Sequence, residues 1–170
     1  MKILVLNGSP RPNGNTAHFV SAFKKAAEEN EHTVNIVNVG QMNIHGCNGC
    51  DYCNLKGNGN CCIKDDMDIV NAFLEGNDLV IFASPVHYWG FSGELQCMIT
   101  RLYNRVKIDC PKFALILSSA SDDVYDALKA QYENIVSYFG GENIGEFTFN
   151  GENQINEENL KVISDFAKSL

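Results

Sequence analysis

Hydrophobic positions along this 170-residue chain follow two different spacings. Short apolar runs, typical of strands buried in a parallel sheet, lie at 2–7, 32–39, 78–84, 112–119 and 144–150. The second run alternates imperfectly, which indicates a strand near a sheet edge. Apolar residues at helical spacing follow the runs, at 15–29, 64–76, 92–106, 122–139 and 157–170.

Five strands that are each followed by a helix predict an α/β fold, a doubly wound five-stranded parallel sheet with helices on both faces. We expect a single domain over residues 1–170, because the length suits one domain and no repeat or long linker interrupts it. Ligands of such sheets bind beyond the carboxyl ends of the strands. The loops at 7–16, 84–93 and 118–123 are therefore the first places to look for a site.

The composition limits the function classes. A hydrophobic share of 45% with 20% charged residues is that of a folded globular protein. Thirteen Lys and Arg against 21 Asp and Glu give a net charge of −8, which argues against a nucleic-acid partner. The apolar run at 2–7 is too short for a signal peptide or a membrane span, so we expect a cytoplasmic protein with no membrane partner. Clustered thiols in that compartment bind metals or catalyse more often than they form disulfides.

The first loop, NGSPRPNGNT at 7–16, has the residues of an anion cradle at a helix N-terminus. Ser9, Asn15 and Thr16 offer hydroxyl or amide donors, and Arg11 offers a charge-assisted fork. The nucleotide-triphosphate and dinucleotide motifs are both absent, since the loop has no lysine and Pro10 replaces the second glycine of Gly-x-Gly-x-x-Gly. The alternative is an ordinary turn in which Asn15 or Thr16 caps the helix.

The second loop, SPVHYWGFSGEL at 84–95, is unusually aromatic, and its rings are His87, Tyr88, Trp89 and Phe91. Such rings at the carboxyl end of a strand can border a planar cofactor, and a flavin fits that description. The alternative is an oligomer contact, and both interpretations hold together in a dimer with its site at the interface. The third loop, SSASDD at 118–123, favours an ordinary helix start with Ser121 or Asp122 as the cap.

A cysteine-rich loop at 46–63 contains CNGCDYCNLKGNGNCC, with five of the seven cysteines. Three thiolates two residues apart, with a fourth further on, suit a [4Fe-4S] cluster. Zinc is the second interpretation and disulfides are the third. Cys97 and Cys110 stand alone in the sequence and are predicted to be small buried hydrophobes.

Taken in order, GSPRPNGNT, CNGC..C, CCIKDDM and SPVHYWGFSGEL resemble the flavodoxin-like NAD(P)H-dependent FMN reductases, and especially their iron-sulfur flavoprotein branch. The resemblance covers roughly the first 105 residues. It implies the strand order 2-1-3-4-5, an FMN cofactor, and a cysteine loop on the cofactor-binding side. It also implies a homodimer or a dimer of dimers.

The resemblance also implies roles for individual residues. The FMN phosphate would lie against Ser9, Arg11, Asn15 and Thr16. The isoalloxazine ring would be bordered by Pro85, Val86, His87, Tyr88, Trp89, Gly90, Ser118 and Ser119. The cluster ligands would be Cys47, Cys50, Cys53 and Cys61, with Cys62 as an alternative to Cys61.

Three departures from the family pattern leave the electron acceptor and the proton donor open. His87 stands where relatives often have tyrosine, Thr100 precedes Arg101 where aspartate is common, and the third loop lacks a glycine. His87 could protonate a reduced flavin or a substrate, or it is a solvated loop histidine. Arg101 and Arg105 are predicted to lie on a solvated helix face.

The sequence thus predicts an FMN-dependent oxidoreductase that passes electrons between FMN and a [4Fe-4S] cluster, with NAD(P)H as a possible substrate. The expected partner is a small-molecule electron acceptor or a ferredoxin-like protein. Three alternatives are kept: a cluster-free NAD(P)H-dependent FMN, quinone or azo reductase, a flavodoxin-type electron shuttle, and a zinc-stabilised binding module.

Overall fold

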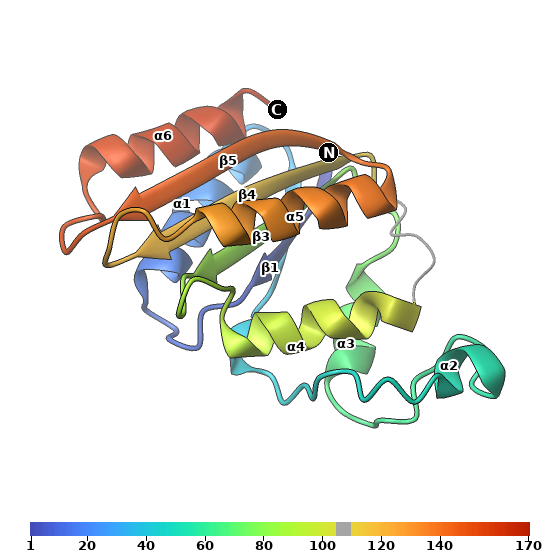
Figure 1. The fold of residues 1–170 in the computed structure, drawn as a ribbon. Helices are drawn as coiled ribbons and strands as arrows, with labels where there is room; N and C mark the ends of the chain where they lie inside the picture. Colours follow the sequence, from blue (N-terminus) through green and yellow to red (C-terminus); the bar gives the residue numbers. More distant parts are fainter. Residues whose placement is uncertain (105–109) are drawn as a thin grey trace.

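A computed structural model describes residues 1–104 and 110–170, and within them five strands form one parallel sheet (Figure 1). The sheet order is β2-β1-β3-β4-β5. The strands are β1 (Lys2–Asn7), β2 (Thr33–Val37), β3 (Leu79–Pro85), β4 (Lys112–Ser119) and β5 (Glu142–Asn150). The predicted fold class and strand order are confirmed.

Helices cover both faces of the sheet (Figure 1). On one face, α1 (Asn15–Glu29) and α6 (Glu157–Lys168) pack side by side. The other face is covered by α3 (Met67–Phe73), α4 (Gly93–Arg101) and α5 (Asp126–Phe139). The short elements η1 (Val39–Gln41) and α2 (Tyr52–Leu55) were not predicted, and η2 (Leu102–Asn104) lies within the helix predicted at 92–106.

The three central strands have continuous apolar stretches because both of their faces are buried, and their polar residues lie at or next to the strand ends. In β1, Ile3 and Val5 face the core under α1 and α6, whereas Leu4 and Leu6 face the core under α3, α4 and α5. β2 lies at the edge of the sheet and is only partly buried, as its imperfect alternation predicted.

The predicted element boundaries differ from the observed ones where a turn intervenes. α5 starts at Asp126 and not near 122, because residues 121–123 form bends and Asp123 adopts a φ of 54°. It ends at Phe139, where Gly140 takes the left-handed conformation that favours glycine. That end matches the prediction, whereas β5 starts two residues before its predicted position.

The N-terminus of α4 matches its prediction, since Ser92 Oγ accepts a hydrogen bond of 3.3 Å from Leu95 N. Its predicted C-terminal part differs: α4 ends at Arg101, and the predicted positions of Arg105 and Val106 lie outside the described residues. Of the helices in 1–104 and 110–170, none has the length and apolar character needed to cross a bilayer.

Candidate functional site

Loops that follow four strands meet at one edge of the sheet and enclose a cavity of about 460 Å³. This volume is within the usual range of small-molecule sites. The cavity is lined by nine of the twelve residues predicted to contact a cofactor: Ser9, Arg11, Asn15, Thr16, Pro85, Val86, His87, Ser118 and Ser119. The structure therefore brings together side chains from all three predicted loops.

The first turn of α1 opens onto this cavity. Gly14 is the N-cap residue, and no side chain of the described residues caps the helix there. The predicted alternative, a cap by Asn15 or Thr16, is wrong, because both residues are already inside the helix. Backbone N–H groups at an uncapped helix N-terminus carry partial positive charge, so they favour an anionic ligand.

A buried hydroxyl pair joins the first loop to the third. Thr16 Oγ1 and Ser118 Oγ lie 2.6 Å apart, in hydrogen-bond contact. Both residues are buried at the wall of the cavity, so the pair fixes the start of α1 against the end of β4.

The first loop itself is held by its neighbours in the sheet. Asn7 Oδ1 accepts a hydrogen bond of 3.1 Å from Ser9 N, and Asn7 Nδ2 donates one of 3.0 Å to Asn38 Oδ1. Gly40 packs directly on the loop backbone, since a β-carbon added there would lie 2.3 Å from the carbonyl carbon and oxygen of Ser9. Only glycine allows this approach.

The second loop divides its residues between the cavity and the solvent. Pro85, Val86 and His87 line the cavity, whereas Tyr88, Trp89 and Gly90 do not. Tyr88 is 94% exposed and Trp89 is 55% exposed, and their rings meet edge to face with centroids 5.1 Å apart.

Tyr88 and Trp89 form the tip of a tight hairpin, at positions where glycine or asparagine is usually found. His87 N donates to Gly90 O at 2.9 Å, and Gly90 N donates to His87 O at 3.0 Å. The tip residues have φ values of 52° and 61°, which are strained for bulky side chains. The next ring of this loop, Phe91, is buried in the core against Phe82.

The loop after β5 supplies cavity residues that the sequence did not indicate: Gly151, Glu152 and Gln154. The Gln154 side chain is 3% exposed, and its Nε2 donates to Ser119 O at 3.0 Å and to Gly151 O at 2.9 Å. These two carbonyls fix the orientation of the amide. Gln154 Oε1 is buried and has no hydrogen-bond partner among the described residues, so it is an unused acceptor at the cavity.

The cysteine loop does not form a metal cage in the structure. Cys53 is buried, Cys61 is half-buried, and Cys47, Cys50 and Cys62 are exposed. Within residues 1–104 and 110–170, no three His, Cys, Asp or Glu side chains converge as metal ligands do. The predicted cluster ligands are thus close in sequence but are not gathered around one point.

Two thiols of this loop do meet. Cys50 Sγ and Cys62 Sγ lie 3.7 Å apart in hydrogen-bond contact. The backbone N–H of Tyr52 and the Cys62 thiol lower the pKa of Cys50, and the same thiol contact raises the pKa of Cys62.

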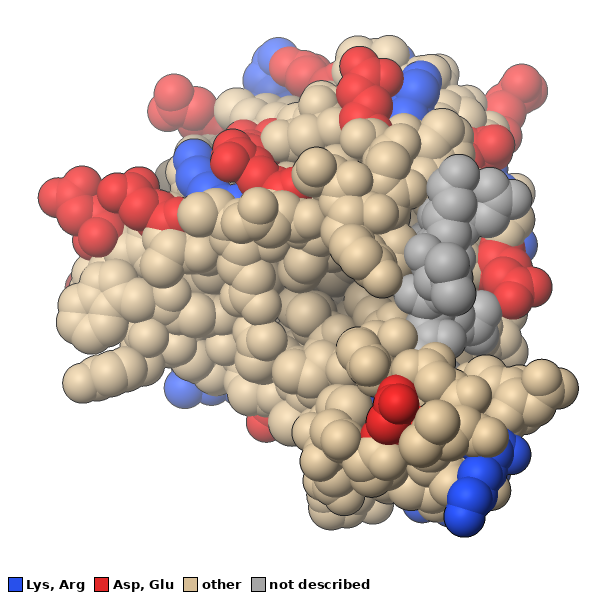
Figure 2. All heavy atoms as spheres, turned by 45° about the vertical axis from the view of Figure 1, so that its right-hand side comes forward, with Lys and Arg blue, Asp and Glu red and all other residues tan. Residues whose placement is uncertain are grey.

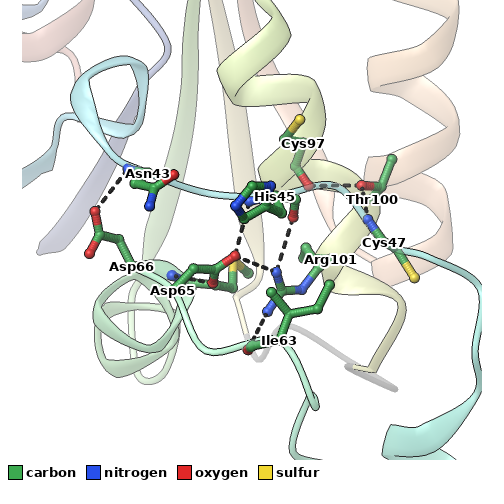
Figure 3. A network of polar contacts seen from close by, with 10 residues as sticks. Asn43, His45, Cys47, Ile63, Asp65, Asp66, Cys97, Thr100 and Arg101 are labelled. Carbon is green, nitrogen blue, oxygen red and sulfur yellow. Dashed lines mark hydrogen bonds and ion pairs between the residues drawn. The ribbon is translucent and has the colours of Figure 1, made fainter.

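A buried ion pair holds both ends of the cysteine loop (Figure 3). Arg101 was predicted to be solvated, but its side chain is 2% exposed and that of Asp65 is 1% exposed. Arg101 Nη1 donates to Asp65 Oδ2 at 2.8 Å and to His45 O at 3.0 Å. Arg101 Nη2 donates to Ile63 O at 3.4 Å. The arginine therefore binds the chain just before the loop and just after it.

Asp65 is satisfied on every side. It accepts hydrogen bonds from Arg101, from His45 N at 2.9 Å and from Met67 N at 3.1 Å. Burial alone would raise the pKa of the Asp65 carboxyl, but these hydrogen bonds outweigh burial and hold the pKa below its usual value. The pKa of Arg101 is raised, because Asp65 and the nearby Cys61 and Cys47 together outweigh its own burial.

Cys97 also lies beside the loop, although it stands alone in the sequence. A β-carbon added to Gly46 would be 3.7 Å from Cys97 Sγ. Thr100 Oγ1 donates to Cys97 O at 2.8 Å and accepts from Cys47 N at 3.1 Å. Cys97 is half-buried, whereas Cys110 is buried as predicted.

The loop that joins β3 to α4 and the cysteine loop meet α4 at opposite ends (Figure 1). At its start, Ser92 N donates to Ser84 Oγ at 3.0 Å, next to the cavity residue Pro85. At its end, Thr100 and Arg101 bind the cysteine loop. None of the cysteines lines the cavity, so the expectation that the loop lies on the cofactor-binding side stays a prediction.

A second hollow lies between α4 and α5 and has a volume of about 690 Å³. None of its lining residues carries a formal charge: Ile99, Thr100, Leu102, Tyr103, Gln131, Asn134, Ile135, Tyr138 and Phe139. The middle of the face in Figure 2 is likewise hollowed and shows no Lys, Arg, Asp or Glu side chains.

Comparison with known proteins gives a consistent group of relatives. The family described as NADPH-dependent FMN reductase matches residues 1–155. An iron-sulfur flavoprotein of Archaeoglobus fulgidus is 35% identical over 102 residues, which are 60% of this chain and 46% of that protein. One of Methanocaldococcus jannaschii is 33% identical over 101 residues, 59% of this chain and 51% of that protein. The chain spans about half the length of the curated relatives it matches.

Among solved structures, an NAD(P)H:quinone oxidoreductase from Methanothermobacter marburgensis superposes with a TM-score of 0.77 at 14% identity. The match covers 99% of this chain and 93% of that one, and it shows the shared fold.

Replacing Gly40 by alanine tests the close contact beneath the first loop. We expect Gly40→Ala to lower the free energy of unfolding by about 2 kcal/mol, because the new methyl group displaces the Ser9 backbone. Urea unfolding followed by circular dichroism measures the change. Gly93→Ala is the matched control, since no atom lies within 4 Å of its added carbon, and a loss equal to that of Gly40→Ala would contradict the contact.

Removing the charge of Asp65 tests the ion pair. We expect Asp65→Asn to lower the free energy of unfolding by about 3–5 kcal/mol at neutral pH, because Arg101 is left buried without its counter-charge. We also expect trypsin to cleave the variant faster after Lys56 in the loop, as seen by mass spectrometry. Glu28→Gln, which breaks the exposed Lys24–Glu28 pair, is the control and should change stability by less than about 0.5 kcal/mol.

The pH profile gives a second readout of the same pair. The pKa of Asp65 is lower in the folded protein than in the unfolded chain. Its contribution to the free energy of unfolding is therefore fully present above the unfolded-state pKa of about 4, and it is lost as the pH falls through the folded-state pKa. In Asp65→Asn the free energy of unfolding should fall less steeply as the pH is lowered below about 4. If it falls as steeply as in the wild type, Asp65 is not charged in the folded protein.

Proposed function

The chain belongs to the NADPH-dependent FMN reductase family, and we propose that it is an FMN-dependent oxidoreductase with FMN in the cavity at the carboxyl ends of the strands. The observation that carries the proposal is the uncapped start of α1, which opens onto a cavity lined by four loops. The names of the relatives, flavoproteins and a quinone oxidoreductase, agree with it.

The residues present fit FMN. The amides of the first turn of α1, with Ser9, Arg11 and Thr16, would hold the phosphate. The walls formed by Pro85–His87 and by Ser118 and Ser119 would border the ring. Gln154 Oε1, the unused acceptor, would take a hydrogen bond from an N–H or O–H of the cofactor.

FMN, when bound, supplies the redox chemistry between a reduced nicotinamide and an acceptor. The protein positions it and controls protons. His87 lines the cavity and its imidazole can carry and release a proton, so we propose it as the proton donor. Tyr88 and Trp89 remain available outside the cavity to contact an incoming acceptor or a second copy of the chain.

A [4Fe-4S] cluster on Cys47, Cys50, Cys53 and Cys61 is the finer part of the proposal. It is supported by the cysteine spacing and by the names of the curated relatives. The loop as described does not fit a cluster, so it would have to rearrange around one, as many metal sites do. Without a cluster, the function reduces to an NAD(P)H-dependent FMN, quinone or azo reductase, or to an electron shuttle.

We further propose that two copies of the chain associate through the uncharged hollow between α4 and α5. Each copy has a net charge of −8, so contact through a charged face would be repulsive. The hollow offers apolar and aromatic side chains instead.

Binding of FMN tests the main proposal. We expect apoprotein to quench FMN fluorescence on titration, and Thr16→Val to bind about tenfold more weakly because Ser118 Oγ loses its partner. Thr33→Val on the exposed start of β2 is the matched control and should bind as the wild type does. FMN-loaded protein should oxidise NADPH or NADH with a quinone acceptor. Absence of FMN binding would overturn the proposal, and binding without turnover would favour the electron shuttle.

Reconstitution under anaerobic conditions tests the cluster. Reduced protein supplied with iron and sulfide should bind four of each per chain, with broad absorbance near about 400 nm, if the site is complete. Cys53→Ser should lose most of this iron. Iron uptake that is equal in the variant, or tight binding of zinc alone, would contradict the cluster, and nicotinamide turnover that survives Cys50→Ser would show a cluster-free reductase.

A further inference from the structure

We propose that Cys50 and Cys62 form a reversible dithiol–disulfide site, and that the disulfide blocks metal binding by the cysteine loop. The two sulfurs are 3.7 Å apart, and both residues are exposed to solvent. Each sulfur has to move on the order of 1 Å to reach bonding distance. Cys62 was predicted only as the alternative to Cys61 among the cluster ligands, yet it is the thiol that contacts Cys50.

The backbone between the two cysteines is built to bring them together. α2 begins two residues after Cys50, and the chain then turns back through residues 57–60, where Asn60 N donates to Gly57 O at 2.9 Å. A β-carbon on Gly57 would lie 2.1 Å from Asn60 O, so glycine is required for the turn. Asn58 and Gly59 follow with positive φ. The turn returns the chain to Cys62.

The ion pair at the base of the loop keeps the two thiols at high effective concentration. Arg101 binds His45 O before the loop and Ile63 O directly after Cys62, so the loop is closed at its base. A loop closed in this way has little chain entropy left to lose when its thiols are joined. The two neighbouring cysteines differ in their partners. Cys61 interacts electrostatically with Arg101, whereas Cys62 contacts Cys50.

A peroxide can oxidise the two thiols in two steps. The sulfur of Cys50 attacks hydrogen peroxide, the O–O bond breaks, and a sulfenic acid and one water form. The Cys62 thiol then attacks that sulfur, a second water leaves, and the S–S bond forms. Two thiols have lost two electrons and two protons, and the peroxide has accepted them. A dithiol reductant reverses the step by exchange.

The disulfide removes Cys50 from the set available to a metal, because a ligand must be a free thiolate. The competition with the cluster rests on the proposed function, whereas formation of the disulfide does not. The loop would thus bind metal when reduced and would be protected from over-oxidation when it is metal-free.

Peptide mapping tests the pairing on the full chain. Reduced, metal-free protein is treated with one equivalent of hydrogen peroxide, its remaining thiols are alkylated, and it is digested with trypsin. Cleavage at Lys56 and Lys64 separates Cys50 from Cys62, so a disulfide appears as two linked peptides. We expect this linked pair in the wild type and its loss on treatment with dithiothreitol.

Variants identify the two sulfurs, since the linked peptides also contain Cys47, Cys53 and Cys61. Cys62→Ser and Cys50→Ser should each reduce the linked species at least tenfold, whereas Cys61→Ser and Cys47→Ser should retain it. Circular dichroism confirms that each variant is folded. Linkage that persists in Cys62→Ser, or that is lost in Cys61→Ser, would overturn the assignment.

Iron uptake tests the competition. Peroxide-treated wild type should bind about tenfold less iron than reduced protein, and dithiothreitol should restore the uptake. Equal uptake before and after oxidation would overturn the blocking role. If reduced protein binds no iron while the Cys50–Cys62 link forms, the cluster proposal fails and the dithiol site stands.

Discussion

All five strands run in the same direction, and this constraint determines where the protein can act. Their carboxyl ends lie at one edge of the sheet, so the strand direction alone brings together the loops after β1, β3, β4 and β5. The start of α1 is aimed at the same edge because the helix must return along the sheet. The buried Thr16–Ser118 hydroxyl pair and the contact of Gly40 with Ser9 then convert a general crevice into a cavity with fixed walls.

The cysteine loop depends on a different kind of interaction. Its 18 residues from 46 to 63 supply few buried side chains, so it has almost no core of its own. Arg101 and Asp65 replace that core with one buried ion pair and a set of backbone hydrogen bonds. Such a pair is rarely more stabilising than apolar residues of the same size, but it specifies one arrangement of the chain. The polar cysteine loop is thereby given a fixed base while its middle stays exposed.

Sequence patterns predicted much of this architecture, for reasons that particular residues make clear. The strand at 112–119 was placed at its observed bounds because its apolar run is continuous, and the cap by Ser92 was found because capping is local. Arg101 was misjudged because its partner is 36 residues away and no local pattern reveals a buried charge. Gln154 was missed because its loop carries no motif, although the position of β5 beside β4 is the signal that could have found it. Tyr88 and Trp89 were correctly placed in the loop, but a tight hairpin at positive φ carries their rings away from the cavity.

The position of α4 has a consequence for how the chain can change over time. The N-cap residue of the helix, Ser92, contacts the strand end beside the cavity, and Thr100 and Arg101 contact the cysteine loop. The length of α4 therefore sets the distance between the cavity and the cysteine loop. Nine helical residues span roughly 14 Å, and each added or deleted residue turns the far end by about 100°. Substitutions within α4 can be absorbed by local repacking, whereas an insertion would swing the cysteine loop around the helix axis. The length of this helix is therefore expected to be less free to vary than its composition.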